Sequence, residues 1–200
     1  MIDIEIMQDA SEIIHYDSPE ISYAVQERLL SNYTDMRALC HWHDDVELLY
    51  IFDGEMNYDV NGRHYLFKKG DTIFINSRQL HYGYDHDQHE CEFMVLLIHP
   101  ELLKASNYMY RRYVLPILNY ATDIVIIENN SPSGAVLTQL FENIRLCRKQ
   151  DKSCHEFQLL GYFYEMWSIL YENCNIEDNV TSNQENPDIQ IGRASCRERV

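Results

Sequence analysis

Residues 41–76 read HWHDDVELLYIFDGEMNYDVNGRHYLFKKGDTIFIN, and this stretch carries most of the information about fold and site. Side chains alternate between the two faces of a β-strand, so His41, His43 and Glu47 are predicted to share one face. Leu49 and Ile51 continue that face with apolar side chains. Two imidazoles and a carboxylate are therefore expected to point into a hydrophobic interior, where polar groups without partners are costly.

A third imidazole, that of His81, is expected to reach the same interior from a separate strand. Three histidines and one carboxylate, here His41, His43, His81 and Glu47, suit a divalent metal ion such as iron, manganese, nickel or zinc. The alternative is that the histidines hydrogen-bond a sugar, water or one another. A buried Glu47 without a cation would carry an uncompensated charge. The ligand types alone leave both alternatives open.

The surrounding sequence has the pattern of many short strands. Asn61-Gly62 is a tight-turn dipeptide between the alternating segments 56–60 and 63–68, which predicts a hairpin. Asp53-Gly54 is a second dipeptide of this kind, and a turn is expected there as well. Further strands are predicted at 21–26, 36–43, 46–52, 72–75 and 91–98. Short strands separated by turns indicate a mainly β protein with a jelly-roll barrel.

Arg37 has the same strand parity as His41 and His43. If the predicted strand 36–43 is unbroken, its side chain faces the same interior. There it could pair with Glu47 or with an anionic or hydroxyl-rich ligand. An exposed arginine at the rim of the barrel is the alternative.

After Pro100 the apolar residues recur at the spacing of a helix. Residues 133–148 carry one apolar face, which predicts a helix. A second helix is predicted over 153–173, with Ser153 and Glu156 as a capping box. Its apolar residues lie nearly all round, so it must be covered on more than one side. Packing under the barrel and pairing in a homodimer through Trp167 and Leu170 are both open.

Composition limits the classes of function. The chain has 16 basic and 32 acidic residues, a net charge of −16. Such a surface repels phosphate backbones, so this chain alone is not expected to bind DNA. There is no run of about 18 apolar residues and no basic-then-apolar leader, so we expect a cytoplasmic protein without membrane association. The six cysteines show no C-x-x-C spacing and are expected to be reduced thiols.

The expected organisation has five parts. They are an N-terminal arm (1–20), a barrel (21–99), a helical extension with possible dimerisation helices (100–175), a polar linker (176–190) and a final segment (191–200). The final segment, IGRASCRERV, resembles the conceptual translation of a sequencing-library adapter and is expected to be a scar rather than part of the fold. The natural protein is expected to continue past Gln190.

Two motifs in the quoted stretch resemble those of the cupin superfamily. His41-x-His43, Glu47 and Gly54 match the spacing of the first motif. The second is degraded: Gly70 and His81 match, whereas Asn76, Arg78 and Asp85 replace the usual Pro, Gly and Asn. Together with LLIHPELL at 96–103, the stretch resembles the ligand-sensing domain of AraC-type bacterial transcription regulators. The resemblance covers about residues 20–175.

This resemblance implies an effector-sensing domain with a cupin-type jelly-roll barrel flanked by a helical pair. A small molecule, such as a sugar or a similar polar metabolite, would bind in the barrel at Arg37, His41, His43, Glu47 and His81. It would control a DNA-binding domain of two helix-turn-helix units beyond this chain. The three histidines and Glu47 would also hold one divalent metal ion.

A stand-alone metal-dependent cupin enzyme, an oxygenase or a sugar isomerase, is the alternative function. It would use the same four metal-binding residues and an open metal position. The sequence offers no further acid–base pair with a clear role, so no catalytic residue is predicted and the sensor is favoured. Fold similarity alone would not decide this, because cupins host both classes.

Overall fold

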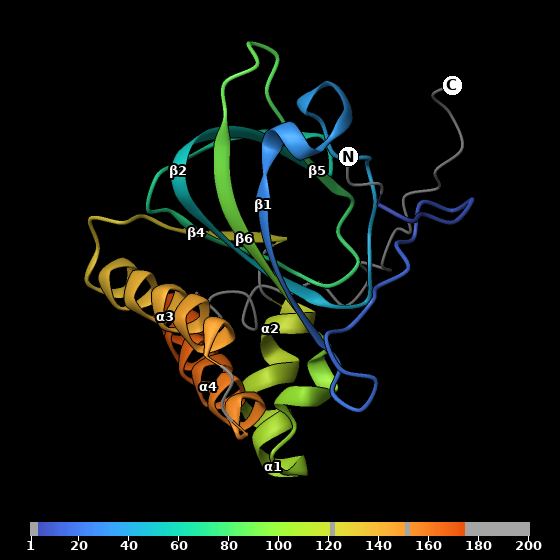
Figure 1. Cartoon of the computed structure of the whole chain (residues 1–200). Coiled ribbons are helices and arrows are strands. Elements are labelled where there is room, and N and C mark those ends of the chain that lie inside the picture. Colours follow the sequence, from blue (N-terminus) through green and yellow to red (C-terminus); the bar gives the residue numbers. More distant parts are fainter. Residues whose placement is uncertain (1–3, 121–122, 151–152, 175–200) are drawn as a thin grey trace, which may run out of the picture.

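The long strand β2 (Val46–Val60) organises the computed structural model, which describes residues 4–120, 123–150 and 153–174. Its first half pairs with β4 and β6, and its second half pairs with β3 and β5. The other strands are β1 (Tyr23–Leu29), β3 (Arg63–Lys68), β4 (Thr72–Ile75), β5 (His81–Tyr84), β6 (Cys91–Ile98) and β7 (Ile124–Ile127). All pairings are antiparallel, in the order β1-β6-β2-β4-β7. The predicted mainly β, jelly-roll-like cupin fold is confirmed, although the described strands do not close into a continuous barrel (Figure 1).

The expected turn at Asp53-Gly54 is wrong, because β2 continues through it. The pairing of β2 with β6 shifts register between Ile51 and Asp53, and Gly54 adopts a φ of +80°. An ideal Cβ placed on Gly54 would overlap the carbonyl oxygen of Glu90. Glycine is therefore needed at this position because two backbone segments approach closely at an irregularity in the strand pairing, and not because the chain reverses.

Replacing Gly54 with alanine should destabilise the fold more than the same change at Gly62. Both glycines have φ near +80°, which costs alanine about 1–2 kcal/mol. Only at Gly54 would the new methyl group also meet neighbouring backbone, which adds roughly 1–3 kcal/mol, as in overpacked sites. Urea unfolding of the two variants measures the difference. Equal losses would show that the close approach of Glu90 has no cost.

The predicted hairpin is confirmed. Asn61 and Gly62 both have positive φ, and Val60 pairs with Arg63, so the two residues form the whole connection. By contrast, residues 36–43 do not form the predicted strand. They contribute only isolated bridges, Arg37 with Tyr84, His41 with His81 and Trp42 with Ser11.

A strand carrying His81 was predicted without bounds and corresponds to β5, whereas β7 was not predicted. β5 is four residues long and contains Gly83, so its sequence carries a weak strand signal. β7 follows the first helices in the chain and returns to pair with β4. The sheet therefore extends beyond the expected boundary at residue 99, and the segment after residue 100 is not wholly helical.

Helices cover one side of the sheet (Figure 1). They are α1 (Asn107–Met109), α2 (Leu115–Tyr120), α3 (Pro132–Lys149) and α4 (His155–Asn173), with a π-turn at Tyr110–Val114 and 3-10 turns at Leu30–Asn32, Thr34–Met36 and Pro100–Leu103. The predicted helical pair, α3 and α4, is confirmed. The predicted capping box is not, since α4 has Cys154 at its N-cap and no side-chain cap. None of the described helices is long and apolar enough to cross a membrane.

The sheet separates two apolar cores. Leu48 and Tyr50 on β2 face the helices, whereas Leu49 and Ile51 face the interior of the jelly roll. Trp167 and Leu170 of α4 belong to the first core and are 5% and 1% exposed. Of the two alternatives left open for this helix, the structure supports packing, because the chain's own sheet and helices already cover Trp167 and Leu170.

The remaining predictions for the C-terminal region concern residues outside the described part of the chain. These are the linker at 176–190 and the adapter-like segment at 191–200. None of the cysteines in the described part of the chain forms a disulfide.

Candidate functional site

The structure brings together the four residues predicted to bind a metal. Glu47 is the second residue of β2, and His43 lies in the bend just before that strand. His81 opens β5, and its backbone exchanges two hydrogen bonds with that of His41, at 2.9 and 3.1 Å. The side-chain nitrogens of the three histidines lie within 4.8 Å of one another. All four residues are buried.

Backbone carbonyls fix the orientation of each imidazole. The Nδ1 atoms of His41, His43 and His81 lie 2.7, 3.0 and 2.8 Å from the carbonyl oxygens of Leu39, Asp45 and Gln79. A carbonyl can only accept a hydrogen bond, so each Nδ1 carries the proton. In the neutral ring the lone pair is then on Nε2. The Nε2 atoms of His43 and His81 are buried and have no hydrogen-bond partner among the described residues.

Glu47 adds a carboxylate to this cluster. Its Oε2 lies 3.4 Å from His43 Nε2 and 3.3 Å from His81 Nε2, and its Oε1 accepts a 2.9 Å hydrogen bond from Tyr58. Burial alone would raise the pKa of Glu47, but the facing imidazoles of His81 and His43 hold this pKa well below its usual value. Burial likewise opposes charge on His43, yet Glu47 raises the pKa of that imidazole. A cation between these groups would stabilise the buried negative charge.

The donor set fits a divalent transition metal. Three imidazoles with Nδ1 bound to carbonyls and Nε2 facing a carboxylate form the ligand arrangement that such ions prefer. The orphaned Nε2 atoms are the observation of this structure that supports the fit.

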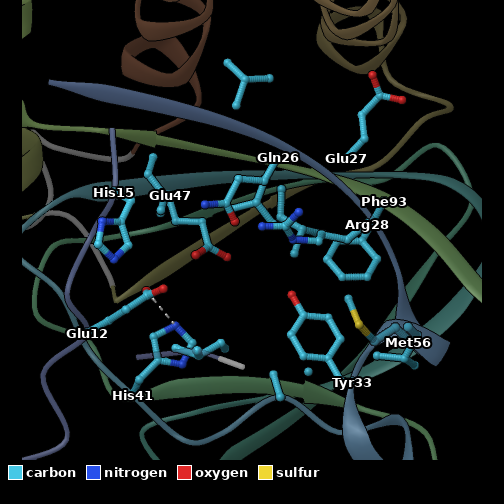
Figure 2. Close-up of a pocket in the computed structure, with 18 of the residues that line it drawn as sticks. Glu12, His15, Gln26, Glu27, Arg28, Tyr33, His41, Glu47, Met56 and Phe93 are labelled. Atoms are coloured by element: carbon cyan, nitrogen blue, oxygen red, sulfur yellow. Dashed lines mark ion pairs between the residues drawn. The ribbon is translucent and has the colours of Figure 1, made fainter. Parts of the chain in front are cut away.

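A cavity of about 620 Å³ adjoins the cluster, and His41 and Glu47 form part of its wall. Apolar side chains of β2 and β6 supply another part of the wall, among them Leu49, Met56 and Phe93. The cavity has the volume of a typical small-molecule site and combines apolar surface with a few polar groups. Figure 2 shows how these side chains converge on one open space.

The N-terminal arm contributes a carboxylate to this cavity that the sequence did not reveal. Glu12 Oε2 lies 3.4 Å from His41 Nε2, and burial raises the pKa of Glu12 to about 7. Trp42 holds the arm: its carbonyl accepts from Glu12 N, and its amide donates to the carbonyl of Ala10. No pattern in residues 1–20 signals this docking, since it depends on a bridge to a distant segment.

Arg28 lines the cavity, whereas Arg37 does not. Arg28 lies on β1 with the inward parity of Ala24 and lines the cavity. The predicted strand ended at residue 26, whereas β1 continues to Leu29. A prediction with the later end would have placed Arg28 on the inward face. Arg37 is exposed, and its guanidinium carbon lies 4.6 Å from the centroid of the Tyr82 ring.

The expectation that Arg37 faces the interior is therefore wrong. The physical reason is that residues 38–40, between Arg37 and His41, form no strand, and the two residues make separate isolated bridges. Strand parity therefore does not carry from the histidines back to Arg37.

Two of the residues that replace the usual second cupin motif support the backbone. Asn76 Nδ2 donates to the carbonyl of Ile117 at 3.1 Å. The Asp85 carboxylate accepts the amides of Asp87 and His89 at 2.9 and 3.0 Å. Neither residue is among those that line the cavity.

Residues 24–166 match the family model of the AraC-like ligand binding domain. The chain belongs to this family. This AraC-like domain is 22% identical over 170 residues to the uncharacterized HTH-type transcriptional regulator YdeC of Bacillus subtilis (strain 168). The match covers 84% of this chain and 58% of YdeC, so the chain spans less than two thirds of that relative.

Solved structures resemble this AraC-like domain at low sequence identity. Apo ToxT from Vibrio cholerae superposes with a TM-score of 0.49 at 12% identity, covering 82% of this chain and 65% of ToxT. ToxT bound to (E)-4-(8-methylnaphthalen-1-yl)but-3-enoic acid gives 0.47 at 13% identity, covering 81% and 66%. The polyketide cyclase RemF from Streptomyces resistomycificus gives 0.35 at 20% identity, covering 38% and 54%.

Proposed function

We propose that this chain is the effector-sensing domain of a transcription regulator. A small polar metabolite binds in the cavity and controls a helix-turn-helix DNA-binding domain that lies beyond this chain. The observation that carries the proposal is the cavity itself, a space of about 620 Å³ between the histidine cluster, β1 and the N-terminal arm. Membership of the AraC-like family and the similarity to a protein named as an HTH-type regulator support it.

The proposal includes one divalent metal ion held by His41, His43, Glu47 and His81. When bound, the ion would supply positive charge to the buried carboxylate and a Lewis-acid position for an effector oxygen. Tyr58 orients Glu47, and the carbonyls at Leu39, Asp45 and Gln79 orient the imidazoles. These contacts keep the four donor groups in place and limit the ordering needed on metal binding.

The polar groups around the cavity support a polar effector. Glu12 and Gln26 line it together with Arg28, and each offers hydrogen bonds to a ligand (Figure 2). Sugars and organic acids both meet this description. The homodimer and the cytoplasmic location expected from the sequence stay predictions.

The purified chain should bind an effector stoichiometrically and release it unchanged. A library of sugars, sugar acids and small carboxylic acids can be screened by thermal shift, followed by mass spectrometry of the released molecule. A ligand at about 100 times its Kd stabilises the fold by about 2.7 kcal/mol, which gives a clear shift. Turnover that requires metal and oxygen, and that disappears in Glu47→Gln, would instead establish the cupin enzyme.

A further inference from the structure

We propose that the effector carries a carboxylate group, which binds to Arg28 and the hydroxyl of Tyr33. This inference rests on the proposed sensing function and narrows it to one class of ligand. Figure 2 shows Arg28 and Tyr33 together on one side of the cavity, with Glu12 and His41 on the other. The cavity therefore has a cationic, hydrogen-bond-donating side and an acidic, metal-binding side.

Arg28 has a hydrogen-bond contact with Tyr33 but no acidic partner among the described residues. Its Nε atom is buried and has no hydrogen-bond partner among residues 4–120, 123–150 and 153–174. No ion pair joins Arg28 to an acidic side chain in those ranges. Three other arginines form ion pairs: Arg78 with Asp44, Arg145 with Glu27 and Glu92, and Arg148 with Asp17.

A guanidinium with a buried, unsatisfied Nε and no acidic partner is unexpected in a chain with 32 acidic and 16 basic residues. Burying part of a charged group without a partner costs free energy. A ligand anion would remove this cost, because it accepts from the buried Nε and neutralises the charge. The position of Arg28 on β1, which pairs with β6 along its whole length, keeps the guanidinium directed into the cavity.

Tyr33 adds a second donor beside Arg28. Its ring is stacked against Phe93, with centroids 6.5 Å apart and an interplanar angle of 14°. Burial raises the pKa of Tyr33, although Arg28 opposes this rise, so the hydroxyl stays protonated at neutral pH. A guanidinium has only donors and the hydroxyl has one to offer, so the complementary group is one that only accepts. A carboxylate meets this requirement with two oxygens, and it can accept two parallel hydrogen bonds from arginine.

The rest of the cavity favours a monocarboxylate with an apolar body. Leu49, Met56 and Phe93 line the space next to these donors. A neutral sugar would leave the charge of Arg28 uncompensated and would place hydroxyls against this apolar wall. A phosphate dianion would be repelled more strongly by the carboxylates of Glu12 and Glu47 than a single carboxylate.

Matched acids and alcohols test this inference by calorimetric titration. The probes are hexanoate with hexan-1-ol and 3-phenylpropionate with 3-phenylpropan-1-ol, and glucose and xylose serve as neutral sugars. We expect at least one acid to bind the wild-type chain about tenfold or more tightly than its alcohol, as a charge-assisted bidentate contact implies. In Arg28→Gln this preference should fall to about twofold or less, and Arg28→Lys should retain only part of it.

Arg63→Gln is the matched control, because Arg63 is exposed on β3 and is not part of the cavity wall. It should keep the full preference for the acid. A second measurement separates binding from folding. Without ligand, Arg28→Gln should melt at or above the wild-type temperature, since it removes a partly buried charge that has no acidic partner. A lower melting temperature together with an unchanged preference for acids would show that Arg28 is structural and would overturn the inference.

The outcomes also separate this inference from the sensing function. If glucose or xylose binds and no acid is preferred, the cavity is a sensor site but the carboxylate inference fails. An acid preference that survives Arg28→Gln also refutes it. Absence of binding by every probe would count against both.

Discussion

Replacing His81 with alanine should abolish high-affinity binding of a divalent metal ion. His81 Nε2 is buried, has no hydrogen-bond partner in the described chain, and lies 3.3 Å from the Glu47 carboxylate. Loss of a group that only orients a ligand costs about 10–100-fold in metal affinity, so loss of a ligand should cost at least about 100-fold. A titration with Co²⁺, followed by its visible absorption, measures the affinity without reference to any activity. Elemental analysis of the purified protein gives the stoichiometry.

His86→Ala is the matched control for this experiment. His86 is exposed and contacts the ring of Tyr84, with centroids 4.8 Å apart, so its removal should leave the Co²⁺ affinity unchanged. If His81→Ala binds Co²⁺ as tightly as the wild-type chain, the cluster is not the metal site. The charge of Glu47 would then be balanced by protonated imidazoles alone. In that case a chelator would not change the melting temperature of the wild-type protein.

Replacing Trp167 with alanine should destabilise the fold by about 3–5 kcal/mol, the usual cost of removing a buried tryptophan. Its indole contacts the ring of Phe74 edge-on, with centroids 6.0 Å apart, and its Nε1 donates a 3.0 Å hydrogen bond to the carbonyl of Tyr113. Truncation leaves a cavity between α4 and the sheet and an unsatisfied carbonyl. Chemical unfolding followed by circular dichroism measures the loss.

Phe157→Ala provides the control on the same helix. Phe157 is 82% exposed, so its truncation should change the free energy of unfolding by less than about 0.5 kcal/mol. Size-exclusion chromatography of both variants tests the role of Trp167 directly. A Trp167→Ala protein that stays as stable as wild type but changes from dimer to monomer would contradict the core role and restore the interface predicted from the sequence.

Local sequence predicted a large part of the fold and the four residues of the histidine–carboxylate cluster. Alternation of apolar and polar residues placed Glu47, Leu49 and Ile51 on one face of β2, and the structure confirms it. The Asn61-Gly62 dipeptide predicted the hairpin because its backbone conformation depends on those two residues themselves. The helical periods predicted α3 and α4 for the same reason, since a period is a property of neighbouring positions.

Where local rules met a distant backbone, the predictions were wrong. The dipeptide Asp53-Gly54 is typical of a turn, yet β2 continues through it. The backbone of Glu90 lies against Gly54, and β3 and β5 pair with the part of β2 that follows. β7 was not predicted, because four apolar residues become a strand only through pairing with β4, about fifty residues earlier. Similarly, the apolar residues of α4 predict that the helix is covered, but they do not indicate whether a sheet or a second chain covers it.

The sequence by itself determined the strand alternation, the hairpin, the helical pair and the four residues of the candidate metal site. Only the tertiary structure decided which other groups share their cavity. Arg37 has the right parity but lies outside, because residues 38–40 between it and the histidines form no strand. Arg28 and Glu12 lie inside, because β1 and the N-terminal arm dock there. Periodicity constrains neighbouring residues, whereas the lining of a cavity depends on long-range packing, which no local pattern encodes.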